Sequence, residues 1–187
     1  MVVGSPRGVG VLASGGGSNL QALIDAGIPI AAVATNVVGA AVLERGERIG
    51  VPTGVFALDA YPDRDARDTA MADWLESHGV GLVVCAGYMH LLRPAFLGRF
   101  PERIVNVHPA LLPAFPGAHA VEEALAAGAT ETGATVHLVD EGIDTGQILR
   151  QEAVAVLPGD TPESLHRRIR AVEHRLLPEV VRGLIAA

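Results

Sequence analysis

The segment IVNVHPALLPAFPG carries two residue types that acyl-transfer chemistry uses. Asn106 and His108 stand two positions apart in an apolar run, and side chains two apart in a strand share one face. Pro109 lacks the N–H that a sheet needs, so the strand is predicted to end there, with His108 at its carboxyl edge. A carboxamide can stabilise a tetrahedral oxyanion, and a neighbouring imidazole can assist it or move a proton. A lone histidine at a strand end is more often structural, but the Asn-x-His-Pro pattern followed by Leu-Leu-Pro favours catalysis.

An acidic loop follows another strand pattern in TVHLVDEGIDTGQI, and it carries Asp140, Glu141 and Asp144. Loops of this kind are commonly solvated turns. A carboxylate that reached His108 would instead favour the imidazolium form and hold the ring in place. Metal binding by these acids is not expected, because no second cluster of ligand residues accompanies them. We interpret His137 as an inward-facing structural residue.

A third segment, VGVLASGGGSNLQALID, leads from a strand through three glycines and Ser18 and Asn19 into an amphipathic helix. Glycines let the backbone turn tightly with its N–H groups inward, and the helix N-terminus adds a positive dipole. These features predict a phosphate cradle that needs no cation. The segment is neither a P-loop, since no Gly-Lys-Ser/Thr follows, nor a clean dinucleotide fingerprint. The alternative is a glycine turn with an ordinary serine cap.

The elements that would position these segments alternate between short apolar runs and helical patterns. The alternation predicts a Rossmann-like α/β fold, with a mostly parallel central sheet and helices on both faces. The predicted strands span 9–13, 30–35, 54–58, 82–86, 104–108, 135–139 and 148–156. The predicted helices span 19–26, 40–49, 64–78 and 121–127, followed by one that Thr161 caps, that runs to about Leu177, and that Pro178 either ends or kinks. Ligands gather at the carboxyl ends of parallel strands, so one site is expected from segments 14–19, 86–92, 106–109 and 140–146.

The composition limits the class of protein. The 187 residues are 49% hydrophobic and 19% charged, which fits one globular domain. The net charge of −7 disfavours nucleic acid or an anionic membrane as partner, and with no lysine an anionic ligand must be held by backbone amides or a few arginines. Cys85, inside LVVCAG, indicates a buried structural thiol in a reducing, cytoplasmic compartment. No apolar stretch suits a signal peptide or a membrane span, and the residues before Gly8 are expected to be a poorly ordered lead-in.

These segments together make the sequence resemble the glycinamide ribonucleotide formyltransferases, the folate-dependent transferases of purine biosynthesis. The resemblance extends from Val9 to about Val181. It rests on five segments that stand in family order and at family spacing: GGGSNLQALID, CAGYMHLL, NVHPALLPAFPG, TVHLVDEGIDTGQI and VEHRLLP.

The resemblance implies a single formyltransferase domain over residues 1–187, which binds phosphate in its part up to about residue 100 and binds folate and carries catalysis in the rest. The activity implied is transfer of the formyl group of 10-formyltetrahydrofolate, a cosubstrate, to the amine of N1-(5-phosphoribosyl)glycinamide, without a metal. Asn106 and protonated His108 would stabilise the oxyanion, and Asp144 would keep His108 charged. The implied partners are these small molecules, not nucleic acid or membrane, and the chain would be a monomer or homodimer.

The resemblance also implies two sets of binding residues. Those for glycinamide ribonucleotide are Gly17, Ser18, Asn19, Arg170 and Glu173. Those for 10-formyltetrahydrofolate are Arg64, Met89, His90, Leu91, Leu92, Asn106, Val139 and Asp140. This chain departs from the common family pattern at Tyr88 and His90, where members often have Phe and Arg, and at Val37, Ala114 and Phe115.

Other enzymes use the same formyl-transfer module. Methionyl-tRNA formyltransferase has an added C-terminal domain and a basic surface, and formyltetrahydrofolate deformylase has an N-terminal regulatory domain; we expect neither here. Sugar-nucleotide N-formyltransferases remain an alternative, although SNLQ beside the glycines better suits a ribose phosphate. A catalytically silent nucleotide-binding domain is a further alternative, but it would not require Asn106, His108 and Asp144 together.

Overall fold

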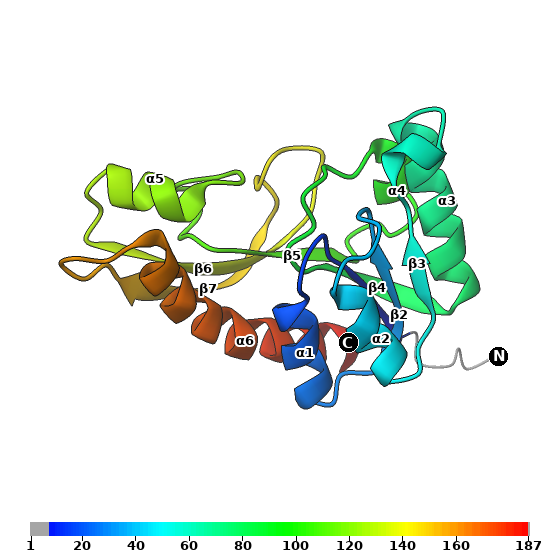
Figure 1. Cartoon of the computed structure of the whole chain (residues 1–187), viewed down its shortest axis with the longest axis horizontal. Helices are drawn as coiled ribbons and strands as arrows, with labels where there is room; N and C mark the ends of the chain where they lie inside the picture. Colours follow the sequence, from blue (N-terminus) through cyan, green and yellow to red (C-terminus); the bar gives the residue numbers. More distant parts are fainter. Residues whose placement is uncertain (1–7, 187) are drawn as a thin grey trace.

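The central sheet is built from short apolar segments that are buried on both faces, as expected for parallel strands covered by helices (Figure 1). The computed structural model describes residues 8–186. The strands are β1 (Gly8–Leu12), β2 (Ile30–Thr35), β3 (Thr53–Val55), β4 (Val80–Cys85), β5 (Ile104–His108), β6 (Glu131–Leu138) and β7 (Ile148–Ala155). The helices are α1 (Ser18–Asp25), α2 (Val42–Arg48), α3 (Arg64–Ser77), α4 (Pro94–Leu97), α5 (Ala120–Ala126) and α6 (Pro162–Ala186), with a 3₁₀ turn η1 at Leu58–Ala60.

The strand order is β3-β2-β1-β4-β5-β6-β7. The strands from β3 to β5 run parallel to their neighbours, whereas β6 runs antiparallel to both β5 and β7. The expected mostly parallel α/β architecture is therefore confirmed. No helix of residues 8–186 has the length and the apolar character needed to cross a membrane.

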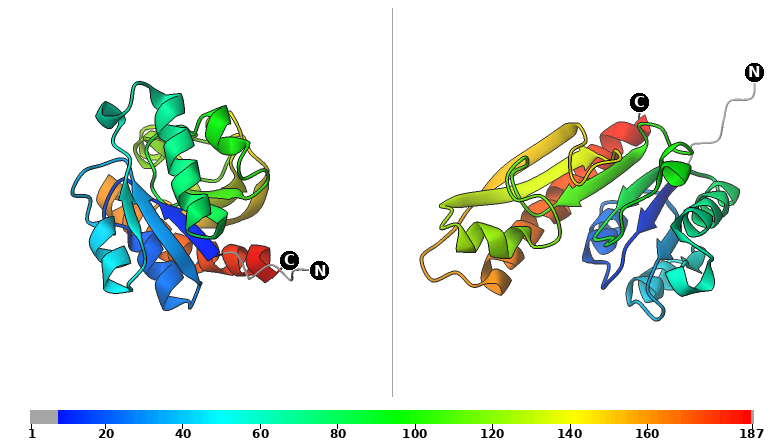
Figure 2. Two further views of the ribbon diagram at one scale, coloured as in Figure 1. Left: turned by 90° about the vertical axis from the view of Figure 1, so that its right-hand side faces the viewer. Right: turned by 90° about the horizontal axis from the view of Figure 1, so that it is seen from above.

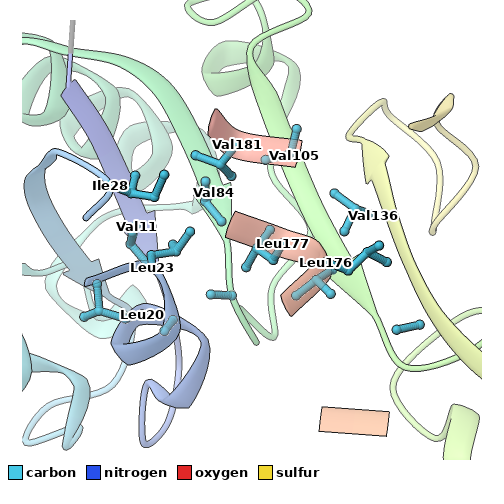
Figure 3. Packing of buried hydrophobic residues seen from close by; sticks show 14 of the residues in the cluster. Val11, Leu20, Leu23, Ile28, Val84, Val105, Val136, Leu176, Leu177 and Val181 are labelled. Atoms are coloured by element: carbon cyan, nitrogen blue, oxygen red, sulfur yellow. The ribbon is translucent and has the colours of Figure 1, made fainter. Parts of the chain in front are cut away.

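Two hydrophobic clusters fix the helices on opposite faces of the sheet. Alternate residues of each strand point to each face, so Val9 and Val11 pack on α1 and α6 while Leu12 packs on α3 and α4. Helices α1, α2, α5 and α6 contribute to the first cluster, and Figure 3 shows Leu176 and Leu177 of α6 among the valines of the sheet. Helix α6 runs along β6 and β7 on that face (Figure 2).

Three predicted boundaries differ from the structure by three residues or more. Helix α6 continues through Pro178 to its end at residue 186, because burial of the neighbouring Leu177 and Val181 against the sheet outweighs the one backbone hydrogen bond that proline removes. The strand predicted over 54–58 ends at Val55, and Leu58 instead begins a 3₁₀ turn. Strand β6 begins four residues earlier than predicted, at Glu131, because it pairs with β7 along its length. The Thr161 cap is confirmed, since its hydroxyl accepts from the Ser164 N–H at 3.2 Å.

The acidic loop does not follow the strand-end rule that predicted its position. Because β6 is antiparallel to β5, Leu138 pairs with Val105, so the loop leaves the sheet near the beginning of β5 rather than near its end. The loop then folds back toward β5, and Figure 1 shows it rising above the sheet between β6 and β7. The four segments do converge, since residues of each line one cleft, but segment 140–146 reaches that cleft by folding back over the sheet and not from a strand end at that edge.

Stability should depend on the packing of α6 on the sheet. Leu176 is fully buried, so Leu176→Ala removes apolar contacts and leaves a cavity, which should lower the free energy of unfolding by about 2–5 kcal/mol. Leu157→Ala is the matched control, because this leucine is 50% exposed and should cost less than about 1 kcal/mol. Urea denaturation of the two variants measures both values, and equal losses would contradict the assignment of Leu176 to the core.

Candidate active site

A cleft of about 560 Å³ opens where β1, β4 and β5 end. Its walls come from the glycine loop before α1, the segment after β4, the end of β5, the acidic loop and α6. It contains eleven of the residues that the sequence predicted for the site: Gly17, Ser18, Asn19, Met89, His90, Leu91, Asn106, His108, Asp144, Arg170 and Glu173. The cleft therefore brings together residues from both halves of the chain.

The predicted trio meets at the end of β5. Asn106 and His108 alternate with Val105 and Val107, which pack in the cluster on the α6 side, so the two polar side chains face the opposite side of the sheet. The His108 Nδ1 lies 3.3 Å from Oδ2 of Asp144, and the Asn106 amide nitrogen lies 3.3 Å from Oδ1 of the same carboxylate. One carboxylate thus contacts both of the other side chains.

The acidic loop is shaped to hold that carboxylate. Asp140 Oδ1 accepts hydrogen bonds from the Gly142 N–H at 3.0 Å and from the Thr145 hydroxyl at 2.7 Å. Asp144 itself has a φ of 53°, in the left-handed region that Asp tolerates better than most residues. A Cβ on Gly146 would lie 1.7 Å from the carbonyl oxygen of Leu138, so only glycine lets the loop close there. The loop therefore has its shape from local contacts.

Asp144 is held in its ionised form. Partial burial acts to raise its pKa, but a hydrogen bond from His137, the Gly117 N–H at 2.8 Å and the charge of the neighbouring histidines together lower the pKa from 3.8 to about 2. The carboxylate therefore keeps its charge across the neutral range.

His137 has a place in the site that the sequence interpretation did not give it. It is buried, as expected, but it stands opposite Asn106 in the β5–β6 pairing and shares its face. Its Nε2 lies 3.4 Å from Asp144 Oδ1 and 3.2 Å from the Asn106 amide nitrogen, while Nδ1 donates to the carbonyl oxygen of Leu138 at 2.8 Å. The strand pattern of TVHL predicted the burial, but only the pairing register shows this contact.

The glycine loop enters α1 without a side-chain cap. The cap position is Gly17, with a φ of 70°, and a Cβ there would lie 2.7 Å from Val42. Ser18 is the first helical residue, so the ordinary serine cap considered from the sequence is not what the structure contains. Residues 15–19 line the cleft, and the free backbone N–H groups of a helix N-terminus commonly bind anions.

Helix α6 supplies the opposite wall. The Asn19 amide donates to Glu173 Oε2 at 3.1 Å, and burial raises the pKa of Glu173 even though this hydrogen bond and the Arg170 charge oppose the change. Arg170 is exposed and lines the cleft one helical turn before Glu173. His166, which the sequence analysis did not single out, lines the cleft one further turn away, and its burial and the Arg170 charge lower its pKa.

A smaller hollow of about 80 Å³ adjoins the trio, and Leu92, Val139 and Asp140 line it. His90 lies at its edge, where Nδ1 accepts from the buried Arg67 at 2.7 Å, and burial and two arginine charges lower the pKa of His90. Arg64 begins α3 outside both hollows, on the side of His90.

Cys85 is a buried thiol at the wall of the smaller hollow. Burial raises its pKa to about 12, so it is not a nucleophile at neutral pH. This agrees with its prediction as a structural residue.

Known proteins share this arrangement over nearly the whole chain. The phosphoribosylglycinamide formyltransferase of Mycobacterium tuberculosis is 48% identical over 184 residues, which are 96% of this chain and 86% of that protein. The enzyme of the same name from Bacillus subtilis is 39% identical and is covered to 93% of its length, with 94% of this chain.

Solved structures agree with the sequence relatives. The crystal structure of glycinamide ribonucleotide transformylase 1 from Symbiobacterium toebii superimposes with a TM-score of 0.93 at 48% identity, covering 95% of this chain and 87% of that one. The family model described as Formyl transferase matches residues 8–181. The chain therefore belongs to the formyl transferase family.

Proposed function

We propose that this chain transfers the formyl group of 10-formyltetrahydrofolate to the primary amine of N1-(5-phosphoribosyl)glycinamide, as an enzyme of purine biosynthesis. The observation that carries the proposal is the position of Asp144. Its carboxylate contacts His108 and Asn106 inside the same cleft that the glycine loop enters. The relatives named for this activity, and the resemblance noted in the sequence, support the choice of substrates.

The ribotide end of the cleft is proposed to be the glycine loop and α6. The phosphate would accept hydrogen bonds from the backbone of Gly17, Ser18 and Asn19, with Arg170 as the nearby cation. Glu173, held by Asn19 at 3.1 Å, would accept from the ribose hydroxyls. Backbone amides suit this chain because they bind a phosphate without adding charge to an acidic protein.

The chemistry is proposed to take place at the trio. The substrate amine attacks the formyl carbon, a tetrahedral intermediate forms, and the carbon–nitrogen bond to the folate breaks as a proton passes from the amine to the folate nitrogen. Asn106 would donate to the oxyanion and the charge of protonated His108 would stabilise it; such stabilisation is commonly the largest catalytic effect. Asp144 would keep His108 protonated.

The folate side is proposed to include both hollows. Met89, His90, Leu91 and Leu92 would surround the pterin with Val139 and Asp140, and Arg64 would hold the acidic tail. The part of the chain up to about residue 100 would then bind mainly phosphate, and the rest would bind folate and carry catalysis. The partners would be these small molecules, and the chain would be a monomer or homodimer. The compartment would be the cytoplasm, which the free buried thiol of Cys85 supports.

The direct test is turnover. Purified chain, ribotide and 10-formyl folate should release the deformylated folate, followed by absorbance, only when the amine is present. Release that does not depend on the amine would indicate a hydrolase. No release under any condition would favour the silent nucleotide-binding domain.

Asp144→Asn should lower kcat about 100-fold or more, because the amide cannot hold His108 as a cation, while KM for both substrates changes little. Glu141→Gln is the matched control, since Glu141 is an exposed acid of the same loop. Steady-state kinetics of the two variants give the comparison. A kcat for Asp144→Asn within threefold of the control would remove Asp144 from the mechanism.

Asp144 should also make stability depend on pH. Its pKa is about 2 in the folded chain and 3.8 by default, so the ionised carboxylate stabilises the fold above about pH 4, and the contribution is lost as the pH falls toward 2. The wild type should lose about 2 kcal/mol of its free energy of unfolding, relative to Asp144→Asn, between about pH 5 and pH 2. Chemical denaturation at both pH values measures it, and a difference that stays constant with pH would contradict the shift.

A further inference from the structure

Phe115 has a backbone conformation that its residue type and its neighbour both disfavour. Its φ is 52°, in the left-handed region that glycine adopts easily and bulky residues rarely do. It also precedes Pro116, and a residue before proline is normally extended. Backbone outliers of this kind persist where surrounding contacts determine them, and they concentrate at functional sites.

Contacts on both sides hold the segment that contains Phe115. On one side the Thr135 hydroxyl donates to the Ala110 carbonyl at 2.7 Å and accepts from the Leu112 N–H at 3.2 Å. On the other side the Gly117 N–H donates to Asp144 Oδ2 at 2.8 Å. The segment is therefore tied to β6 and to the acidic loop, and Phe115 lies between the two attachments.

The result of this conformation is a contact with His108. The His108 Nε2 lies 2.7 Å from the carbonyl oxygen of Phe115, and since a carbonyl can only accept, Nε2 must carry the proton. The other ring nitrogen, Nδ1, faces the Asp144 carboxylate at 3.3 Å. A neutral imidazole has one N–H, so only the imidazolium donates to both acceptors.

We propose that the strained backbone of Phe115 positions the catalytic histidine: its carbonyl holds the Nε2 proton of His108, which turns the Nδ1–H edge toward Asp144 and the cleft. Phe115 acts through His108 and not by touching substrate, so it is a positioning residue. This inference rests on the proposed formyl transfer and adds to it the device that sets the orientation and the protonation of the ring.

The two acceptors act together. Each accepts from one N–H of the ring, so the two contacts together hold the ring in a single orientation. The other groups on this side of the sheet are His137, which shares Asp144, and Asn106. From α6, the Arg170, His166 and Glu173 side chains line the same cleft. None of these groups replaces an acceptor at Nε2, because the Phe115 carbonyl already occupies that position at 2.7 Å.

The test changes the backbone preference at residue 115 and leaves His108 intact. Phe115→Gly keeps access to a positive φ, whereas Phe115→Val has a β-branched side chain that opposes it. The Val variant should lose kcat about tenfold or more, with KM for both substrates within threefold. The Gly variant should retain both kcat and KM within threefold.

Glu102 supplies the matched control. It has a φ of 56° and is exposed in the turn before β5, at the opposite end of that strand from His108. Glu102→Val and Glu102→Gly should both leave kcat unchanged. A Phe115→Val enzyme with the wild-type kcat would overturn the proposal, as would equal losses in the Gly and Val variants, which would assign the effect to the aromatic ring.

The wild type provides a test that does not depend on folding of a variant or on turnover. Nitrogen-15 NMR of the histidine rings, with the His108 signals assigned by their loss in His108→Gln, should show a proton on Nε2 at neutral pH. A bare Nε2 with the proton on Nδ1 alone would contradict the contact. An inactive wild type whose His108 shows the Nε2 proton would overturn the formyl-transfer proposal but not the positioning of the ring.

Discussion

The arrangement of the site depends on one partly buried carboxylate. Asp144 has lost most of its contact with water, and a charge in that position persists only if other groups supply what water would have supplied. Its oxygens therefore receive the Gly117 N–H and face two histidines and the Asn106 amide. Asn106 and His108 come from β5, His137 from β6 and Gly117 from the segment after Pro109, so satisfying one charge aligns these three segments.

The reversal of strand direction at β6 makes that alignment possible. If β6 and β7 were parallel, the connection between them would have to cross back over the sheet, usually through a helix, and would be much longer. The antiparallel β6–β7 pair allows a short connection instead, and the connection folds back over the sheet with glycine at residue 146, where a side chain would collide with Leu138. Asp144 thus reaches His108 from the loop that folds back over the sheet, while the glycine loop enters the cleft from the end of β1.

Local pattern predicted the parts of the molecule that depend on local physics. Alternation placed Asn106 and His108 on one face, and the glycines before α1 predicted the tight turn that leads into that helix. The contact between Asp144 and His108, and the role of His137, depend on which strands pair and in which direction, and a strand's period of two is the same in either direction. The sequence left open whether the last helix ends at Pro178 or continues through it, because the burial that keeps α6 continuous is a tertiary effect.

In the proposed mechanism, the residues that bind the phosphate and ribose lie apart from the residues that act on the formyl group. The glycine loop and α6 lie at one end, joined by the Asn19–Glu173 hydrogen bond, and the trio lies at the end of β5. Binding energy gained on a phosphate and ribose, which do not react, can then hold the amine near the formyl carbon, and such positioning is worth several orders of magnitude in rate. The trio needs rigidity for the same reason, because holding the amine in place raises the rate only if the catalytic side chains are also held in place. A backbone fixed by two attachments around Phe115, and a carboxylate fixed by its need for partners, provide that rigidity without any lysine in the chain.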